Sequence, residues 1–256
     1  SLRKWASNGL RPLLHRQNRL VQKWADGIIV CSRADRQYLI DTGSTSPKRI
    51  LALDPGLPPE LLRSNPPRLT LARCHHLLYV GQFAPVKAPE LVAGVMADIL
   101  AQRPLASASW ICEKRHHAQV RALLPERVQG RVTLIDWMSR IDCMKVYDAH
   151  GIYLFPSFFE GFPQTVLEAM ARGMAVLATR VGGMAQAIED GVNGFLFSRG
   201  QRREMVQRVN ELLDGRVDVG RLGDAARDTA ARYTWTRSAE TLDHFLRALS
   251  TMPTRS

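Results

Sequence analysis

The sequence predicts an α/β fold in which helices flank a parallel, Rossmann-like sheet. Short apolar runs of strand length alternate along the chain with longer segments of good helix formers. Hydrophobic residues make up 45% of the 256 positions, which is enough for a proper core and argues against disorder. Residues 152–173 show the pattern most clearly, because an apolar run, a loop and a helical segment follow one another directly.

The expected strands are short and apolar, and several end at a turn residue or a helix cap such as Ser32. They cover residues 25–32, 49–53, 76–81, 106–112, 131–135, 152–157 and 175–179. We expect the strands at 25–32, 152–157 and 175–179 to be buried.

The expected helices lie between capping residues and stop signals. They cover residues 33–41, 88–101, 163–172, 201–213, 221–232 and 235–249, with a further helix capped by Ser139 and a short one after Gly183. Residues 113–117 are expected to form a loop whose two histidines are solvated. Residues 2–24 also have helical spacing. A core-facing helix is the commoner explanation of that spacing, and a helix at a membrane interface is the alternative.

The cysteines are widely spaced and form no Cys-x-x-Cys pair. We therefore expect them to be small, buried, hydrophobic side chains of a protein in a reducing compartment. They are Cys31, Cys74, Cys112 and Cys143. No uninterrupted apolar run approaches the length that crosses a membrane. We therefore expect a cytoplasmic protein.

The formal net charge of +11 favours an anionic partner, which could be nucleic acid, a membrane face or an acidic substrate. Basic residues cluster at 3–23, 114–121 and 199–208. We prefer an anionic membrane surface, with the protein peripheral on the inner membrane face, although a soluble protein with a basic surface explains the charge equally well. We expect no nucleic-acid partner, because no helix-turn-helix, zinc or stacking-aromatic pattern is present.

Two carboxylates in residues 152–173 are placed to act on a ligand. Glu160 lies in the loop, and Glu168 lies inside the helix that Pro163 suits as a starting residue. Backbone N–H groups at a helix start attract an anion, so a phosphate can dock at Gly161–Thr165. Glu168 can accept hydrogen bonds from a sugar diol. A nucleotide sugar has a phosphate between two hydroxyl-rich ends and fits this arrangement.

The segment contains, in order, Pro156-Ser157, Glu160-Gly161-Phe162, Glu168-Ala169-Met170-Ala171 and Gly173. This order resembles the donor-binding motif of glycosyltransferase family 4, the retaining enzymes of GT-B architecture. The resemblance covers residues 25–249 and is specific only in residues 152–197. It implies a Rossmann-like donor-binding domain of GT-B type plus a partial second Rossmann-like domain.

The resemblance also implies roles for residues at the end of the strand over 76–81. Lys87 matches a lysine that holds the donor diphosphate in the family. The family usually has arginine where this chain has Gln82, so the site lacks one charge and one bidentate phosphate contact. Lys87 and the backbone N–H groups of Gly161–Thr165 would stabilise the leaving diphosphate.

Glu160 would contact the hydroxyls of the donor sugar and orient its anomeric carbon, and Glu168 would hold the ribose hydroxyls. The backbone at Phe162 and Pro163 would face the sugar. The predicted catalytic residues are Lys87 and Glu160. The predicted substrate-binding residues are Gly81, Gln82, Lys87, Glu160, Gly161, Phe162, Pro163, Gln164, Thr165 and Glu168. We expect no cofactor and no metal, since the chain has no Asp-x-Asp pair to bridge a metal-bound diphosphate.

The expected domain organisation follows from length. A complete Rossmann-like half needs on the order of 150 residues, and far fewer precede the Pro-rich stretch at 58–73. We expect a remnant of the acceptor-side domain, a linker, a donor-binding domain, a helix that crosses back and a tail. Their ranges are 1–60, 61–74, 75–232, 233–250 and 251–256.

The predicted function is transfer of a sugar from a nucleotide diphosphate sugar to an acceptor hydroxyl, with retention, by the enzyme or by its donor half. The acceptor would be a glycan or a lipid-linked molecule in cell-envelope polysaccharide synthesis. The alternative is an inactive nucleotide-sugar-binding module that lacks the acceptor domain.

Overall fold

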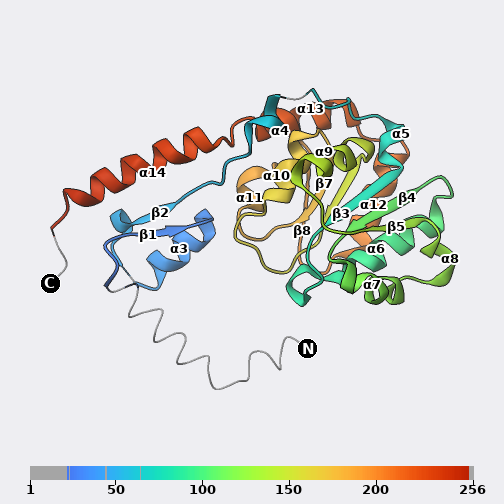
Figure 1. The fold of residues 1–256 in the computed structure, drawn as a ribbon, viewed down its shortest axis with the longest axis horizontal. Helices are drawn as coiled ribbons and strands as arrows, with labels where there is room; N and C mark the ends of the chain where they lie inside the picture. Colours follow the sequence, from blue (N-terminus) through green and yellow to red (C-terminus); the bar gives the residue numbers. More distant parts are fainter. Residues whose placement is uncertain (1–21, 23, 44, 64, 254–256) are drawn as a thin grey trace, which may run out of the picture.

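The structure, a computed structural model, describes residue 22 and residues 24–253 apart from 44 and 64 (Figure 1). The helix expected over 2–24 therefore lies outside the described residues, except for Gln22 and Trp24. Two parallel sheets organise the described chain, and we call them the small sheet and the large sheet.

The large sheet confirms the predicted α/β fold. Its six strands follow the order β5-β4-β3-β6-β7-β8, and every neighbouring pair is parallel. The strands are β3 (His76–Val80), β4 (Ser107–Ile111), β5 (Val132–Ile135), β6 (Ile152–Phe155), β7 (Ala175–Thr179) and β8 (Phe195–Phe197). The edge strand β8 was not among the expected strands, because its three residues follow closely spaced turn dipeptides.

Helices cover both faces of the large sheet and bury a core on each (Figure 1). Side chains of β3 alternate between these cores, as the period of a strand requires: Leu77 and Tyr79 enter one, and Leu78 and Val80 enter the other. The first core is shared by α5 (Leu71–Cys74), α6 (Pro89–Gln102), α7 (His117–Leu123), α8 (Glu126–Gln129) and α12 (Arg202–Leu213). The second is shared by α4 (Pro59–Arg63), α9 (Arg140–Ala149), α10 (Gln164–Ala171) and α11 (Met184–Ala187), while α13 (Val219–Ala230) contributes to both.

The small sheet consists of β1 (Ile28–Val30) and β2 (Ile50–Ala52), with α3 (Arg33–Asp41) between them in sequence. The expectation of a buried first strand was wrong, since Ile29 is 48% exposed. A strand is buried only where elements cover both of its faces, and the described elements leave the Ile29 side chain half open. The thiol-bearing residue that follows, Cys31, is also exposed, unlike the other three cysteines.

The Pro-rich stretch at 58–73 contains α4 and most of α5, and Leu61 in α4 and Leu69 just before α5 are buried. One further expectation was wrong. Residues 113–117 form a 3-10 turn, η3 (Lys114–His116), that leads into α7. The ring of His116 stacks on Phe83 with centroids 5.4 Å apart, so this histidine is packed and not a solvated loop residue.

The last helix, α14 (Trp235–Ser250), leaves the large sheet and runs along the small one (Figure 1). At its start the chain pairs with the segment after β2: Leu57 N donates to Tyr233 O at 2.8 Å, and Leu57 bridges Thr234. Gly56 is required there, because a Cβ on it would lie 2.3 Å from the backbone nitrogen of Trp235. The two sheets are therefore joined by two chain segments that lie side by side.

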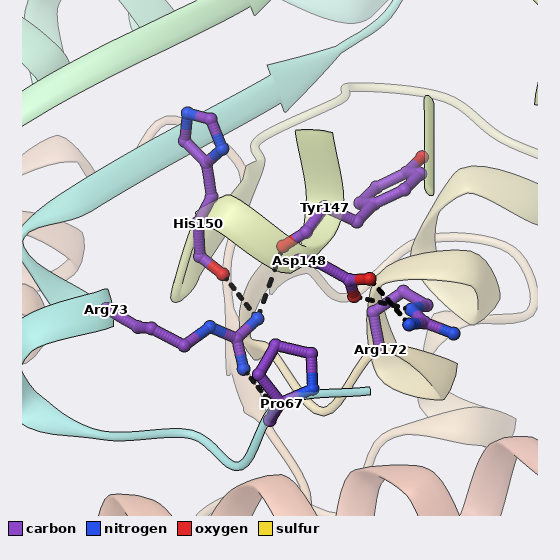
Figure 2. Close-up of polar contacts among 6 residues, drawn as sticks. All are labelled: Pro67, Arg73, Tyr147, Asp148, His150 and Arg172. Atoms are coloured by element: carbon purple, nitrogen blue, oxygen red, sulfur yellow. Dashed lines mark hydrogen bonds and ion pairs between the residues drawn. The ribbon is translucent and has the colours of Figure 1, made fainter. Parts of the chain in front are cut away.

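A half-buried arginine fixes the carboxyl end of α9 (Figure 2). The Arg73 guanidinium donates to the carbonyls of Tyr147 at 3.2 Å, His150 at 2.7 Å and Pro67 at 2.6 Å. The Tyr147 carbonyl also accepts from His150 N at 3.1 Å, so the guanidinium adds a second bond there and ties the end of α9 to the chain at Pro67. Beside it, Arg172 pairs with Asp148 through two bonds of 2.7 Å. In the described part of the chain, none of the helices combines the length and apolar character that a bilayer crossing requires.

Candidate functional site

The order of strands places a candidate ligand site at the carboxyl ends of β3 and β6. These strands are neighbours in the middle of the large sheet, with β4 and β5 on one side and β7 and β8 on the other. Connections run in opposite directions from this pair, and parallel sheets bind ligands outside the strand ends at such a switch point. The loops that follow β3 and β6 carry most of the predicted site residues.

Lys87 and Glu160 meet at this switch point. The Lys87 ammonium lies 2.6 Å from Glu160 Oε1, and the two side chains are 21% and 9% exposed. The same ammonium lies 5.7 Å from the ring centroid of Phe155, at the end of β6. The loops are also joined through their backbones, because Phe158 N donates to Val86 O at 2.8 Å. The structure thus brings together the two residues predicted to be catalytic.

A strained backbone position holds the lysine in place. Lys87 ends the 3-10 turn η2 (Pro85–Lys87), and Ala88 follows with φ 54°, in the left-handed region that favours glycine. Pro89 then begins α6. A non-glycine residue in this region costs about 1 to 3 kcal/mol and persists where the surrounding structure over-determines it. Ala88 is 1% exposed, so its packing supplies that constraint.

The two residues that follow β3 differ in exposure. Gly81 is buried, and a Cβ on it would lie 2.4 Å from the hydroxyl of Tyr79. Gln82 is exposed, next to the stack of Phe83 on His116. Gly81 therefore allows the chain to pass the buried phenol, while Gln82 faces solvent near the Lys87 loop.

The loop from Glu160 to Phe162 rests on two glycines after β7. Gly182 has φ 52°, and a Cβ on it would lie 2.2 Å from the carbonyl oxygen of Glu160. A Cβ on Gly183 would lie 2.1 Å from the ring of Phe162. The backbone of Gly183 donates to Gly161 O at 2.7 Å. The glycine pair therefore sets the position of the Glu160 loop.

Helix α10 begins without a side-chain cap on its first backbone donors. Its N-cap is Pro163, which supplies no side-chain hydrogen bond, and its first residues Gln164 and Thr165 are half-buried. The helix ends before Gly173, whose φ of 66° provides the expected stop. This start suits an anion, because the amide groups of the first turn carry partial positive charge.

Glu168 is buried inside α10 and engaged through both oxygens. Its Oε1 lies 3.1 Å from Nε of Arg140, and its Oε2 accepts from the Tyr147 hydroxyl at 3.0 Å. Burial raises the pKa of Glu168, while the bond from Tyr147 and the charge of Arg140 act in the opposite direction. A carboxylate so held can still accept bonds on its free lone pairs.

Sequence reasoning missed Arg140 and Tyr147 as residues of this site. Both lie on α9, whose cap by Ser139 was predicted and is confirmed by a hydrogen bond from Asp142 N. Arg140 also donates to Gln164 Oε1 at 3.4 Å. Their spacing of two helical turns places both on one face of α9, and that spacing is the signal that was available.

The small sheet approaches the site from the other side. A Cβ on Gly161 would lie 3.2 Å from Cβ of Cys31. The backbone of Arg33 donates to Gln186 Oε1 at 2.6 Å, and Gln186 Nε2 donates to Asp54 Oδ1 at 3.2 Å. The site therefore lies between the large sheet and the ends of β1 and β2. It combines a paired cation, a helix start and a buried carboxylate, a set that suits a ligand with a phosphate and hydroxyl groups.

A family model described as "Glycosyl transferases group 1" matches residues 74–215. The chain is 28% identical over 250 residues to D-inositol 3-phosphate glycosyltransferase 2 of Catenulispora acidiphila, covering 88% of this chain and 57% of that protein. It is 29% identical over 232 residues to D-inositol 3-phosphate glycosyltransferase of Mycobacterium ulcerans, covering 85% and 49%. The chain thus spans about half the length of the curated relatives it matches.

Solved structures share the fold. TarM has a TM-score of 0.78 and 16% identity, with 93% of this chain and 46% of that chain covered. Sucrose-phosphate synthase from Thermosynechococcus elongatus has a TM-score of 0.75 and 21% identity, with 91% and 60% covered. Anabaena HepE in complex with UDP has a TM-score of 0.72 and 20% identity, with 91% and 66% covered.

Proposed function

The chain belongs to the glycosyl transferases group 1 family, and on that premise we propose that it is a retaining glycosyltransferase of family 4, or the donor half of one. It moves a sugar from a nucleotide diphosphate sugar to an acceptor hydroxyl. The observation that carries this proposal is the contact of 2.6 Å between Lys87 and Glu160 at the switch point of the large sheet. Relatives named as glycosyltransferases, and a structural neighbour in complex with UDP, support it.

The proposed donor lies across the start of α10. Its diphosphate takes the N–H groups of Gly161–Thr165 and the charge of Lys87, which stabilise the leaving group where negative charge develops. Its ribose hydroxyls donate to Glu168. When a diphosphate binds Lys87, Glu160 can accept hydrogen bonds from the hydroxyls of the transferred sugar. These bonds orient the anomeric carbon. Gly81, Gln82, Phe162 and Pro163 line the remaining path of the donor.

The proposed division of the chain is the one its length suggests. Residues 75–232 form the donor-binding domain, residues 1–60 belong to the acceptor-side domain, residues 61–74 link them and residues 233–250 cross back. An envelope glycan or lipid-linked acceptor, and a cytoplasmic protein on the inner membrane face, complete the proposal. The net charge of +11 supports that location, because an anionic leaflet attracts basic protein surfaces.

One observation favours a second candidate, a nucleotide-sugar-binding module without turnover. The chain spans about half the length of its relatives, so groups that bind the acceptor can lie outside it. Both candidates bind the donor, and only the first transfers or hydrolyses it. Release of nucleoside diphosphate from the donor, measured over time, separates them.

Calorimetric titration with UDP, GDP and ADP tests the donor site. We expect saturable binding of one diphosphate, weakened about tenfold or more by Lys87→Ala and by Glu168→Ala, since each removes a charged partner of the ligand. Lys145→Ala and Glu240→Ala are matched controls, because both residues are exposed. Lys145 lies on α9 and Glu240 on α14, whereas Lys87 and Glu168 lie in η2 and α10. Failure of all three diphosphates to bind a folded sample contradicts the proposal.

A further inference from the structure

We propose that Arg140 is a positioning residue of the donor site, which holds the Glu168 carboxylate ionised and ready for the ribose hydroxyls and thereby keeps donor affinity from falling as the pH is lowered. This inference rests on the proposed function, because it assigns Glu168 to the ribose. Arg140 acts through Glu168 and takes no part in the transfer itself.

The geometry around Glu168 carries the proposal. Two residues of one helix divide its carboxylate between them: Arg140 Nε lies 3.1 Å from Oε1, and the Tyr147 hydroxyl donates to Oε2 at 3.0 Å. Each oxygen can accept a further bond, since an ionised carboxylate offers about four lone-pair sites. A vicinal diol can therefore add to the carboxylate while both residues stay in place.

The two partners differ in exposure and in freedom. Tyr147 is 1% exposed, whereas the Arg140 side chain is 49% exposed. The backbone of Tyr147 is also fixed, because its carbonyl accepts from Arg73 at the end of α9 (Figure 2). Tyr147 is thus a rigid partner, and Arg140 is the adjustable partner on the solvent side.

Arg140 also spans from the carboxylate to the start of α10. Its Nη2 donates to Gln164 Oε1 at 3.4 Å, at the first residue of that helix. A guanidinium is planar and presents several donors in a fixed arrangement, so one side chain can hold both acceptors. Arg140 therefore aligns Glu168 relative to the amide groups that would hold the diphosphate.

The charges near Glu168 explain why the arginine matters. Burial raises the pKa of Glu168, and the groups that interact with it are Arg140, Tyr147 and Cys143 on α9 and Tyr153 on β6. Arg140 is the cation among these groups. Its removal leaves burial less opposed, so the carboxyl binds a proton at higher pH. A protonated carboxyl accepts hydroxyl bonds less well, and donor affinity then falls as the pH falls.

The test compares two ligands on the full chain. The ligands are the ribonucleoside diphosphate that the wild type binds and its 2′,3′-dideoxy analogue, titrated between pH 5.5 and 8.5. Arg140→Ala should weaken the ribonucleotide about tenfold at pH 7 and more at lower pH, and it should leave the analogue unchanged. Arg140→Lys should recover part of the loss. Arg247→Ala is the control, because Arg247 is 79% exposed in an ion pair on α14.

Three results overturn the proposal. Equal weakening of both ligands means that Arg140 contacts the phosphates directly. If Arg140→Ala binds both ligands with unchanged affinity while Glu168→Gln binds the ribonucleotide more weakly, Arg140 is not part of the site and the proposed function stands. A wild type that binds no nucleoside diphosphate removes the proposed function and this inference together.

A ligand-free measurement covers the case in which Arg140→Ala folds poorly. Carbon-13 NMR follows the carboxyl of Glu168, assigned by its disappearance in Glu168→Gln, in the wild type and in Arg140→Lys and Arg140→Gln. We expect the pKa of Glu168 to rise in Arg140→Gln and to rise less in Arg140→Lys. Equal pKa values in all three proteins contradict the proposal.

Discussion

Lys87 and Glu160 are 73 residues apart in sequence, and their charged atoms lie 2.6 Å apart in the fold. Each belongs to the loop after one of the two central strands, so the pair closes the switch point of the large sheet. The pair neutralises two half-buried charges in the free protein. Under the proposed function, Lys87 would leave Glu160 to bind the entering diphosphate.

The Lys87–Glu160 pair should contribute measurably to stability. Lys87→Met leaves Glu160 without its cation, and Glu160→Gln leaves Lys87 without its anion, so each variant should lower the free energy of unfolding. The double variant should lose less than the sum of the two, with a coupling energy of about 1 to 3 kcal/mol. Urea unfolding of the four proteins gives this value, and a coupling near zero would show that solvent screens the pair.

Gly182 should be far less tolerant of a side chain than Gly191. Both have positive φ, 52° and 79°, so alanine costs about 1 to 2 kcal/mol of backbone strain at either. Only Gly182 adds a collision, since its Cβ would meet the carbonyl of Glu160 at 2.2 Å, whereas nothing lies within 4 Å of one on Gly191.

We therefore expect the free energy of unfolding of Gly182→Ala, measured by urea unfolding, to be lower than that of Gly191→Ala by about 2 kcal/mol or more. Nucleotide binding should be lost only in Gly182→Ala, because its collision displaces the Glu160 loop. Equal effects of the two substitutions would mean that the loop relaxes without cost.

Without ligand, Glu168→Gln should become more stable relative to the wild type as the pH rises. Burial raises the pKa of Glu168 in the folded state above its ordinary value of 4.5. The folded state therefore binds this proton more tightly than the unfolded state does. The resulting stabilisation of the wild type is complete below pH 4.5 and is lost as the pH rises through the folded-state pKa. Glutamine carries no such titration. The free energy of unfolding of the variant minus that of the wild type should therefore grow upward from pH 4.5, as measured by urea unfolding at several pH values. A constant difference would place the Glu168 pKa at its ordinary value.

Asp148→Asn should be strongly destabilising. Its partner Arg172 is 2% exposed in side chain and donates two bonds to this carboxylate, so the substitution removes the negative charge that neutralises a buried guanidinium. Loss of one partner of a buried pair costs on the order of 3 kcal/mol. Asp243→Asn is the matched control, since the Asp243–Arg247 pair is exposed and contributes at most about 0.5 kcal/mol. Thermal unfolding of both variants compares them directly.

Local signals predicted much of the fold. Ser32 and Ser139 both cap the helices expected after them, and Gly173 ends α10 with the positive φ that its type allows. These outcomes depend on residues a few positions apart, which the sequence displays. The apolar runs likewise predicted the strands of the large sheet other than β8, because strands buried on both faces need no polar alternation.

Features set by tertiary contact could not be predicted in this way. Arg140 reaches Glu168 across 28 positions, and no local pattern marks that pairing. The short helices α4 and α5 form in a Pro-rich stretch because Leu61 and Leu69 pack into the cores of the large sheet. The exposure of Ile29 depends on which elements cover β1, and its own apolar run does not reveal that.

The paired segments at Leu57 and Thr234 have a mechanical consequence. A single chain segment between two bodies leaves them free to twist and to swing, because each backbone bond rotates on its own. Here two segments run side by side and are tied by the bond of 2.8 Å from Leu57 to Tyr233 and by that of 2.8 Å from Ser238 to Asp54. Twisting would shear these bonds, whereas bending about the line through them keeps both. The small sheet is thus held against twisting more firmly than a single connecting segment would hold it.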